Sequence, residues 1–225
     1  MSVELSVAIM AHPSRKDRIP AIEKLLLPYA ETRVELDEND EGPWAVAKRC
    51  WEGTPENATH SMILQDDVLL CQDFYVGACR AIRHRPASPL AFYANSKSVD
   101  EAREQGRAWA RVSGMWGVAQ CLPAPYVKAL LCWATNALND PDYADNVDTH
   151  GIPGDDWFLS RFLKKAKLKT WATVPSLVEH GLPKNSLMGH RQVRKDQRVA
   201  RWFIGENVSA LSVDFRKRKP CLPTS

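Results

Sequence analysis

Two adjacent carboxylates, Asp66 and Asp67, follow an apolar run at residues 61–65 and precede a second one at residues 68–70. A buried strand that ends in acids brings them to the carboxyl edge of a sheet, where open α/β sheets bind ligands. The two charges repel each other unless a positive charge lies between them, and Mg²⁺ or Mn²⁺ is the usual solution. The alternative is that the pair forms a turn and caps the next helix.

A second acidic pair and a histidine come later in the chain. Asp155 and Asp156 open an amphipathic pattern behind a long polar loop at residues 139–154, and His180 follows a late strand pattern beside Glu179. Taken singly, Asp155 could cap its helix while Asp156 complements the helix dipole, and His180 could be structural. The conjunction and order of the three elements favour a functional site over these separate readings.

The first 70 residues alternate between strand and helix patterns. Short apolar runs predict strands at 5–10, 32–36 and 61–65. Apolar residues at helical spacing predict helices at 19–29 and 44–51. This alternation implies a parallel sheet with right-handed crossovers. Neither GxGxxG nor a Walker A lysine motif follows the first strand, which argues against a dinucleotide-binding Rossmann fold and a P-loop enzyme.

The rest of the chain continues with mixed patterns. Further helices are predicted at 72–83, from Pro123 onward, at 154–163 and at 193–204, and further strands at 90–94, 112–122 and 168–174. Residues 96–107 are polar and suit either a surface helix or a loop. Gly114 and Gly117 fall inside the strand predicted at 112–122, where a backbone can come close to a ligand.

The order of these motifs resembles that of GT-A-fold glycosyltransferases over residues 5–190. Gln65-Asp66-Asp67-Val68 looks like the "EDD" variant of the metal-binding motif of lipopolysaccharide-type enzymes, and Gly154-Asp155-Asp156-Trp157 looks like their later "ED" motif. His180 is similar in position to their metal-binding C-terminal histidine. The implied fold is α/β, with a Rossmann-like, mixed but mainly parallel sheet flanked by helices. Gln65 departs from the pattern, because an acid often stands there, and this leaves open which carboxylate binds metal.

The resemblance implies a Mn²⁺ or Mg²⁺ ion and a nucleotide-sugar donor, most simply a UDP-sugar. Asp67 would be the main metal ligand and His180 an additional one, while Asp66 would be either a ligand or a contact to the ribose. The metal would stabilise the charge that develops on the diphosphate leaving group. Asp156, or less favourably Asp155, would take the proton from the acceptor hydroxyl.

Nucleotide contacts are expected from two loops. His12, Ser14 and Arg15 follow the first strand, where Arg15 could pair with phosphate in bidentate fashion or be a solvated surface residue. Ser14 could also cap the helix that follows. By the resemblance, Asp37 or Asp40, after the second strand, would contact the nucleoside.

Length and composition suit one soluble domain of 225 residues, with the transferase-like part at 1–190 and a basic segment at 191–225. No apolar run approaches the roughly 20 residues needed to cross a bilayer, and the acidic N-terminus does not read as a signal peptide. The six cysteines lack CxxC spacing, which indicates reduced thiols in a cytoplasmic protein. The resemblance to lipopolysaccharide-type and phage-encoded transferases implies that this cytoplasm is that of a bacterium or a phage-infected host cell.

Charge is distributed unevenly along the chain. Residues 191–219 carry nine Lys/Arg against three Asp/Glu, a net +6, so that the rest carries −3 of the total +3. The basic segment suggests a polyanionic partner, although a solvated tail without a partner is the alternative. The acceptor could therefore be DNA carrying a hydroxylated base, as in phage-encoded transferases, or a bacterial envelope glycan or its lipid carrier.

Two other functional classes fit the same residues. A metal-dependent nuclease or phosphodiesterase would use Asp66, Asp67, Asp156 and His180 around one or two metal ions. A non-catalytic module would bind nucleotide or nucleic acid without turnover. A nuclease would act with Mg²⁺ alone and need no sugar donor, whereas a binding module would not respond to loss of Asp156.

Overall fold

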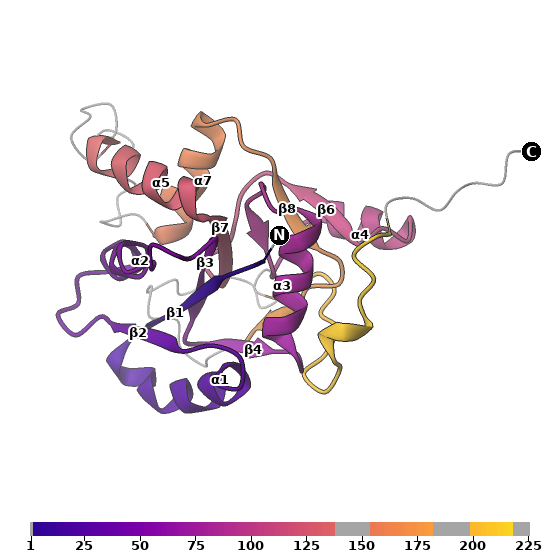
Figure 1. Cartoon of the computed structure of the whole chain (residues 1–225), viewed down its shortest axis with the longest axis horizontal. Helices are drawn as coiled ribbons and strands as arrows, with labels where there is room; N and C mark the ends of the chain where they lie inside the picture. The colour runs from indigo at the N-terminus through magenta and orange to yellow at the C-terminus, as the bar shows by residue number, and fades with distance from the viewer. Residues whose placement is uncertain (1, 138–153, 182–198, 218–225) are drawn as a thin grey trace, which may run out of the picture.

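The computed structural model describes residues 2–137, 154–181 and 199–217. Its centre is a seven-stranded sheet (Figure 1). In sheet order the strands are β2 (Thr32–Leu36), β1 (Leu5–Ala11), β3 (His60–Gln65), β7 (Ala119–Pro123), β5 (Leu90–Ala91), β8 (Thr170–Thr173) and β6 (Trp109–Val112).

The sheet is mixed but mainly parallel. β2, β1 and β3 run in the same direction, as the alternation of the first 70 residues predicts. β7 is antiparallel to both β3 and β5, β8 is parallel to β5, and β6 is antiparallel to β8. Only β7 and β6 therefore oppose the other described strands of this sheet, and the expected α/β class with a mixed, mainly parallel sheet is confirmed.

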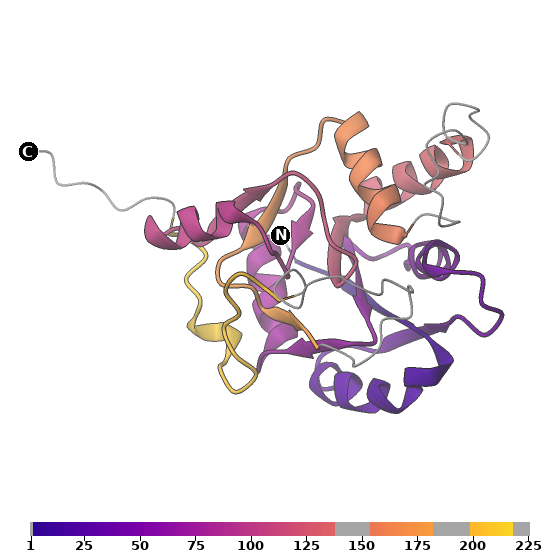
Figure 2. The ribbon, with the colours of Figure 1, turned by 180° about the vertical axis from the view of Figure 1, so that it is seen from behind.

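Helices cover both faces of the sheet, which gives three layers (Figures 1 and 2). Because side chains alternate along a strand, Val7 and Ile9 of β1 enter one core while Ala8 and Met10 enter the other. The first core includes α1 (Ile19–Leu26) and α3 (Phe74–His84). The second includes α2 (Pro43–Glu52), α4 (Lys97–Glu104), α5 (Ala124–Ala137) and α7 (Asp155–Lys165).

A second, two-stranded sheet positions His180. β4 (Val68–Leu70) pairs in antiparallel fashion with β9 (Val178–His180), and the register places Val68 opposite His180. Since Asp67 immediately precedes β4, this pairing brings a late histidine to the acids at the end of β3.

The strand predicted over 112–122 is wrong. β6 ends at Val112 and β7 begins at Ala119, with β8 and β5 lying between them in the sheet. Residues 113–118 form the connection, and they are held by packing with elements remote in sequence: a Cβ on Gly114 would lie 2.8 Å from Ser160 Oγ, and one on Gly117 would lie 2.5 Å from Gln65 Nε2. The polar stretch 96–107, for which two readings were open, contains α4.

The described part of the C-terminal segment, residues 199–217, packs on the body of the protein. Gln72 and Ser209 form a parallel bridge, as do Ser176 and Phe203, and Ala210 and Phe215 are buried in the core beside α3. Residues 199–204 are not helical, because their backbone pairs with Ser176 instead, so this part of the helix predicted at 193–204 is wrong. Residues 193–198 and most of the predicted loop at 139–154 lie outside the described residues.

Two further expectations concern cysteines and membranes. All the cysteines within the described residues are free thiols. A search of the same residues found no helix with the length and apolar character that a membrane span requires.

Candidate functional site

Arg15 lies between the two carboxylates that follow β3. Its Nη1 atom is 2.9 Å from Asp66 Oδ1 and 2.8 Å from Asp67 Oδ2. The other oxygen of Asp66 accepts a hydrogen bond of 2.8 Å from the backbone N–H of His12. Burial raises the pKa of the Asp66 carboxyl, and the His12 N–H and the Arg15 guanidinium act in the opposite direction. A cation from the first loop thus offsets the repulsion between the acids.

The loop after β1 supplies that cation because β1 and β3 are adjacent and parallel. A 3-10 helix over Pro13–Arg18 follows β1, and His12 caps it by accepting a hydrogen bond at Nδ1 from the backbone N–H of Ser14. Ser14 is therefore not the capping residue, and its own hydroxyl lies 2.8 Å from His12 Nδ1. His12, Ser14 and Arg15 all follow the carboxyl end of β1, and His12 and Arg15 contact Asp66 directly.

His180 approaches Asp67 from the small sheet. Its Nε2 atom is 3.5 Å from Asp67 Oδ2, and only 11% of the His180 side chain is exposed. Asp67 Oδ1 is buried and has no hydrogen-bond partner among the described residues. Gly181 closes the corner: its N–H donates to the Asp67 carbonyl at 2.6 Å, and a Cβ at this position would lie 2.7 Å from the same oxygen.

These groups suit a divalent cation that also binds a substrate phosphate. Mg²⁺ usually takes one or two carboxylates plus phosphate oxygens, and a carboxylate with an imidazole is an acceptable set for Mn²⁺. Asp67 offers a buried oxygen without a partner and His180 offers a ring nitrogen nearby, whereas both oxygens of Asp66 already accept hydrogen bonds. Within the described chain, no cluster of three or more His, Cys, Asp or Glu side chains is arranged to hold a metal by itself.

The second acidic pair divides between the core and a cavity. Gly154 is the N-cap of α7 and makes no side-chain capping bond, so the reading of Asp155 as the N-cap is wrong. Asp155 is buried and accepts a hydrogen bond of 3.0 Å from Gln120 Nε2 on β7. Burial, with a smaller contribution from the Asp156 charge, raises the pKa of the Asp155 carboxyl. Asp156 is half-buried and faces the cavity.

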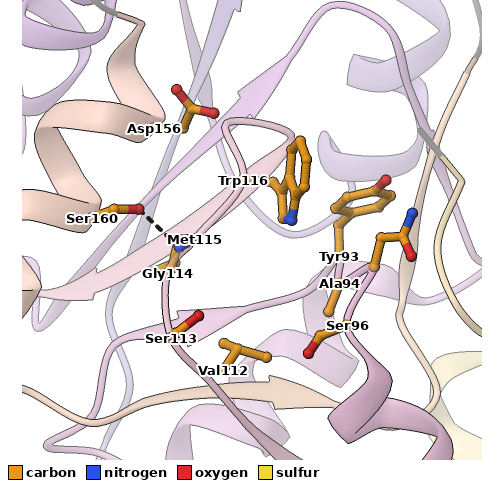
Figure 3. A pocket seen from close by; sticks show the side chains of 11 residues that line it. Tyr93, Ala94, Ser96, Val112, Ser113, Gly114, Met115, Trp116, Asp156 and Ser160 are labelled. Atoms are coloured by element: carbon orange, nitrogen blue, oxygen red, sulfur yellow. Dashed lines mark hydrogen bonds between the residues drawn. The ribbon is translucent and has the colours of Figure 1, made fainter. Parts of the chain in front are cut away.

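That cavity has a volume of about 350 Å³ (Figure 3). α7 forms one wall through Asp156 and Ser160, and residues 93–96 form another. The Ser160 hydroxyl also accepts a hydrogen bond of 3.3 Å from the Met115 N–H, which fixes the connection between β6 and β7. The lining combines hydroxyl, amide and carboxylate groups with two aromatic rings: Tyr93, Ala94, Asn95, Ser96, Val112, Ser113, Gly114, Met115, Trp116, Asp156 and Ser160.

Two sets of contacts connect the elements around the cavity with the acid pair. The Tyr93 ring, in the cavity wall, has its centroid 6.4 Å from that of His180, which in turn contacts Asp67. Gly117 lies between Gln65, which precedes Asp66, and the Asp155 carboxylate. A Cβ on Gly117 would lie 2.5 Å from Gln65 Nε2 and 2.9 Å from Asp155 Oδ2. The structure therefore brings the first acids, the second acids and His180 to one region.

Asp37 and Asp40 have other surroundings. The Asp37 carboxylate accepts hydrogen bonds from the backbone N–H groups of Glu41 and Gly42 at 2.7 and 3.1 Å, and so holds its own loop. Asp40 is exposed and has a left-handed backbone with φ of 55°. Neither lines the cavity beside Asp156.

Sequence reasoning missed most of the cavity wall. Tyr93, Asn95, Ser96, Trp116 and Ser160 carry no motif, and they meet only through the packing of three separate segments. The one local signal was the pair of glycines at 114 and 117, which indicated a close approach of the backbone. The structure shows this approach to be toward α7 and Gln65.

Comparison with known proteins gave structural likenesses alone. No family model matches the sequence, and no curated protein matches it either. A197 from STIV superposes with a TM-score of 0.47 and 13% identity, covering 79% of this chain and 86% of A197. GalNAc-T7, solved with UDP, GalNAc and Mn²⁺, superposes with a TM-score of 0.48 and 10% identity, covering 85% of this chain. This chain spans 47% of the GalNAc-T7 chain.

Proposed function

We propose that this protein is a metal-dependent glycosyltransferase that moves a sugar from a nucleotide-sugar, most simply a UDP-sugar, to an acceptor hydroxyl. The observation that supports this most is a polar and aromatic cavity with Asp156 in its wall, whose lining residue Tyr93 packs near His180, which in turn contacts Asp67. Hydroxyl and amide groups can hydrogen-bond a sugar, and aromatic rings can pack against its apolar face. The carboxylate–imidazole pair next to this cavity suits a metal-bound diphosphate.

In this proposal Asp67 and His180 hold Mn²⁺ or Mg²⁺. The ion would neutralise charge that develops on the diphosphate as the sugar leaves, a contribution of several kcal/mol in such roles. Asp66, whose oxygens accept from the His12 N–H and Arg15, positions the loop after β1 and does not ligate the metal. Arg15, His12 and Ser14 face the nucleotide, and Arg15 is suited to a phosphate because its guanidinium presents several donors in one plane.

Asp156 acts as the base that accepts the proton of the attacking hydroxyl. It lines the cavity, whereas Asp155 is buried against Gln120 and lies outside the lining. Asp155 then has a supporting role: it anchors the start of α7 to β7 and so places Asp156. Exposed Asp40 remains a candidate for contact with the nucleoside, and Asp37 is assigned to holding that loop.

The acceptor is either a hydroxylated base in phage DNA or a bacterial envelope glycan. The basic C-terminal composition suits the first, and the polar cavity suits either. The acceptor does not alter the roles proposed for Asp67, His180 and Asp156.

A thermal-shift panel of nucleoside diphosphates and nucleotide-sugars, each with and without Mn²⁺, tests the donor half of this proposal. A ligand that binds only the folded protein stabilises it by about 2.7 kcal/mol at a hundred times its dissociation constant. We expect a shift with one nucleotide-sugar that requires Mn²⁺ and is lost in Asp67→Asn. Glu104→Gln removes an exposed carboxylate at the end of α4 and should leave that shift unchanged.

Donor turnover tests the other half. Asp156→Asn should keep the Mn²⁺-dependent shift and lose transfer by about 10²–10⁴-fold, which is the usual contribution of a general base. A folded protein that shows no shift with any nucleotide-sugar would instead support the nuclease or binding-module readings. Plasmid degradation with Mg²⁺ alone would identify the nuclease.

A further inference from the structure

A second pocket, of about 340 Å³, lies at the β6 edge of the sheet. In the strand order, β7, β5 and β8 separate this edge from β3 and its acids. Three cationic side chains and three aromatic rings line it together with one histidine, and none of its described lining residues carries a carboxylate. These residues are Arg85, Arg107 and Lys217, with Trp109, Trp171 and Phe215. The composition indicates a ligand that has both negative charge and a planar ring.

Two of the cations of this pocket, Arg85 and Arg107, have surroundings that bear on a ligand. The Arg85 guanidinium carbon lies 3.7 Å from the centroid of the Trp171 ring and 4.8 Å from that of Trp109, which are cation–π contacts. Arg107 Nε is buried and has no hydrogen-bond partner among the described residues. A buried donor without a partner costs free energy, and an anion that enters the pocket would recover it.

The C-terminal segment contributes Phe215 and Lys217 to the lining of this pocket. Trp109 Nε1 donates a hydrogen bond of 2.9 Å to the Phe215 carbonyl, and the Ala108 N–H donates one of 3.1 Å to the Lys217 carbonyl. These bonds hold the backbone of Lys217 against β6 while its side chain stays exposed.

We propose that this pocket binds a nucleotide unit of a single-stranded nucleic acid. Arg107, Lys217 and Arg85 would contact phosphate, and the half-buried Trp171 with its stacked guanidinium would offer a surface for a base, since bases stack on both indole and guanidinium planes. A strand is favoured over a free nucleotide because three separate cations, Arg85, Arg107 and Lys217, line the pocket and can contact more than one phosphate. The proposal does not depend on transferase activity.

The test is fluorescence anisotropy of a short labelled oligothymidylate titrated with the full chain at about 50 and about 200 mM salt. We expect binding at low salt that weakens as salt rises. Arg107→Gln and Lys217→Gln should each weaken it several-fold and reduce the slope of log K against log salt by about 0.7, the value for one phosphate contact on a single strand. Lys128→Gln, which removes an exposed charge on α5, is the matched control and should leave the slope unchanged.

Three outcomes would overturn the proposal. The first is the absence of oligothymidylate binding at low salt, and the second is an equal loss of affinity in Arg107→Gln, Lys217→Gln and the control Lys128→Gln. The third is competition by thymidine monophosphate that is as effective as competition by the unlabelled strand at equal nucleotide concentration. The last would assign the pocket to free nucleotides. Thermal melts verify that the variants fold. If Arg107→Gln does not fold, Lys217→Gln still tests the proposal, because the Lys217 side chain is exposed.

Discussion

Arg15 is a residue with two competing sets of partners in the proposed mechanism. Its guanidinium now binds the Asp66 and Asp67 carboxylates, whose side chains are 5% and 7% exposed, and it is itself 14% exposed. A metal at Asp67 would supply the same neutralising charge and release Arg15 toward a phosphate. Arg15 is therefore expected to compete with a divalent cation for Asp67 when no nucleotide is bound.

Arg15→Met tests this competition. Removing one partner of a buried ion pair leaves uncompensated charge, so the variant should lose about 3–5 kcal/mol of unfolding free energy without metal. Mn²⁺ should then raise the melting temperature of the variant more than that of the unaltered protein, measured without nucleotide. Lys16→Met, an exposed neighbour, is the control. If Mn²⁺ raised the melting temperature of Arg15→Met and Lys16→Met equally, Arg15 would not compete with the metal for Asp67.

Asp155 gives a pH-dependent prediction at the same scale. Burial raises the pKa of its carboxyl in the folded state above the unfolded value of about 3.9. The stability that this group contributes is complete below the unfolded pKa and is lost as pH rises through the folded pKa. Asn at this position does not titrate and still accepts from Gln120. Asp155→Asn should therefore become progressively more stable relative to the unaltered protein as pH rises from about 4.

Urea denaturation across a pH series measures that difference. Each unit by which the folded pKa exceeds the unfolded one adds about 1.4 kcal/mol to the change. A difference that stays constant with pH would show that Asp155 has an ordinary pKa. Transfer activity would remain to some degree in Asp155→Asn, because this residue anchors Asp156 and does not replace it.

At the scale of elements, the connection between β6 and β7 packs closely because position 117 is a glycine. A Cβ on Gly117 would lie 2.5 Å from Gln65 Nε2, 2.9 Å from Asp155 Oδ2 and 3.0 Å from its Oδ1. Gly117→Ala should therefore displace this connection, cost about 1–3 kcal/mol of unfolding free energy as overpacking does, and lower transfer. Chemical denaturation and donor turnover measure the two effects.

A double-mutant cycle locates the cause. The Gln65 amide is the nearer and more flexible obstacle, so Gln65→Ala combined with Gly117→Ala should recover part of the stability lost in Gly117→Ala. Strict additivity of the two single changes would show that Gln65 is not the group displaced. The carboxylate of Asp155, fixed by Gln120, should account for the part that is not recovered.

Elements with local patterns were predictable from the sequence, and those set by remote contacts were not. β1, β2, β3 and the helices between them follow from apolar periodicity, because each packs apolar side chains into or against a core. The split of 112–122 into two strands depends on Ser160 and Gln65, which no local window includes. Likewise, the acids and His180 could be proposed as partners, but the β4–β9 pairing and the place of Arg15 between the acids arise only in the fold.

At the scale of the whole molecule, the described part of the basic C-terminal segment, residues 199–217, packs into the core despite its charge. The sequence assigned residues 191–225 to a basic segment from their charge, yet the described part contains Ala210, Val213 and Phe215, which are 0%, 7% and 2% exposed. Ala210 is in close contact with α3, since a Cβ on Gly77 would lie 2.3 Å from the Cβ of Ala210. Charge and burial therefore alternate along one segment, and the charged residues are held on the surface by apolar neighbours.

Phe215→Ala separates these two properties. The ring is buried and its centroid lies 5.5 Å from that of Trp109, so its removal should cost about 3–5 kcal/mol and lower the melting temperature of the entire domain in a single transition. Arg216→Ala, at an exposed position whose partner is Asp214, should change the melting temperature little. Calorimetry of both variants gives the comparison. If Phe215→Ala melted at the temperature of the unaltered protein, the segment would be an appendage that contributes charge alone, and the nucleic-acid pocket would lose the side that holds Lys217.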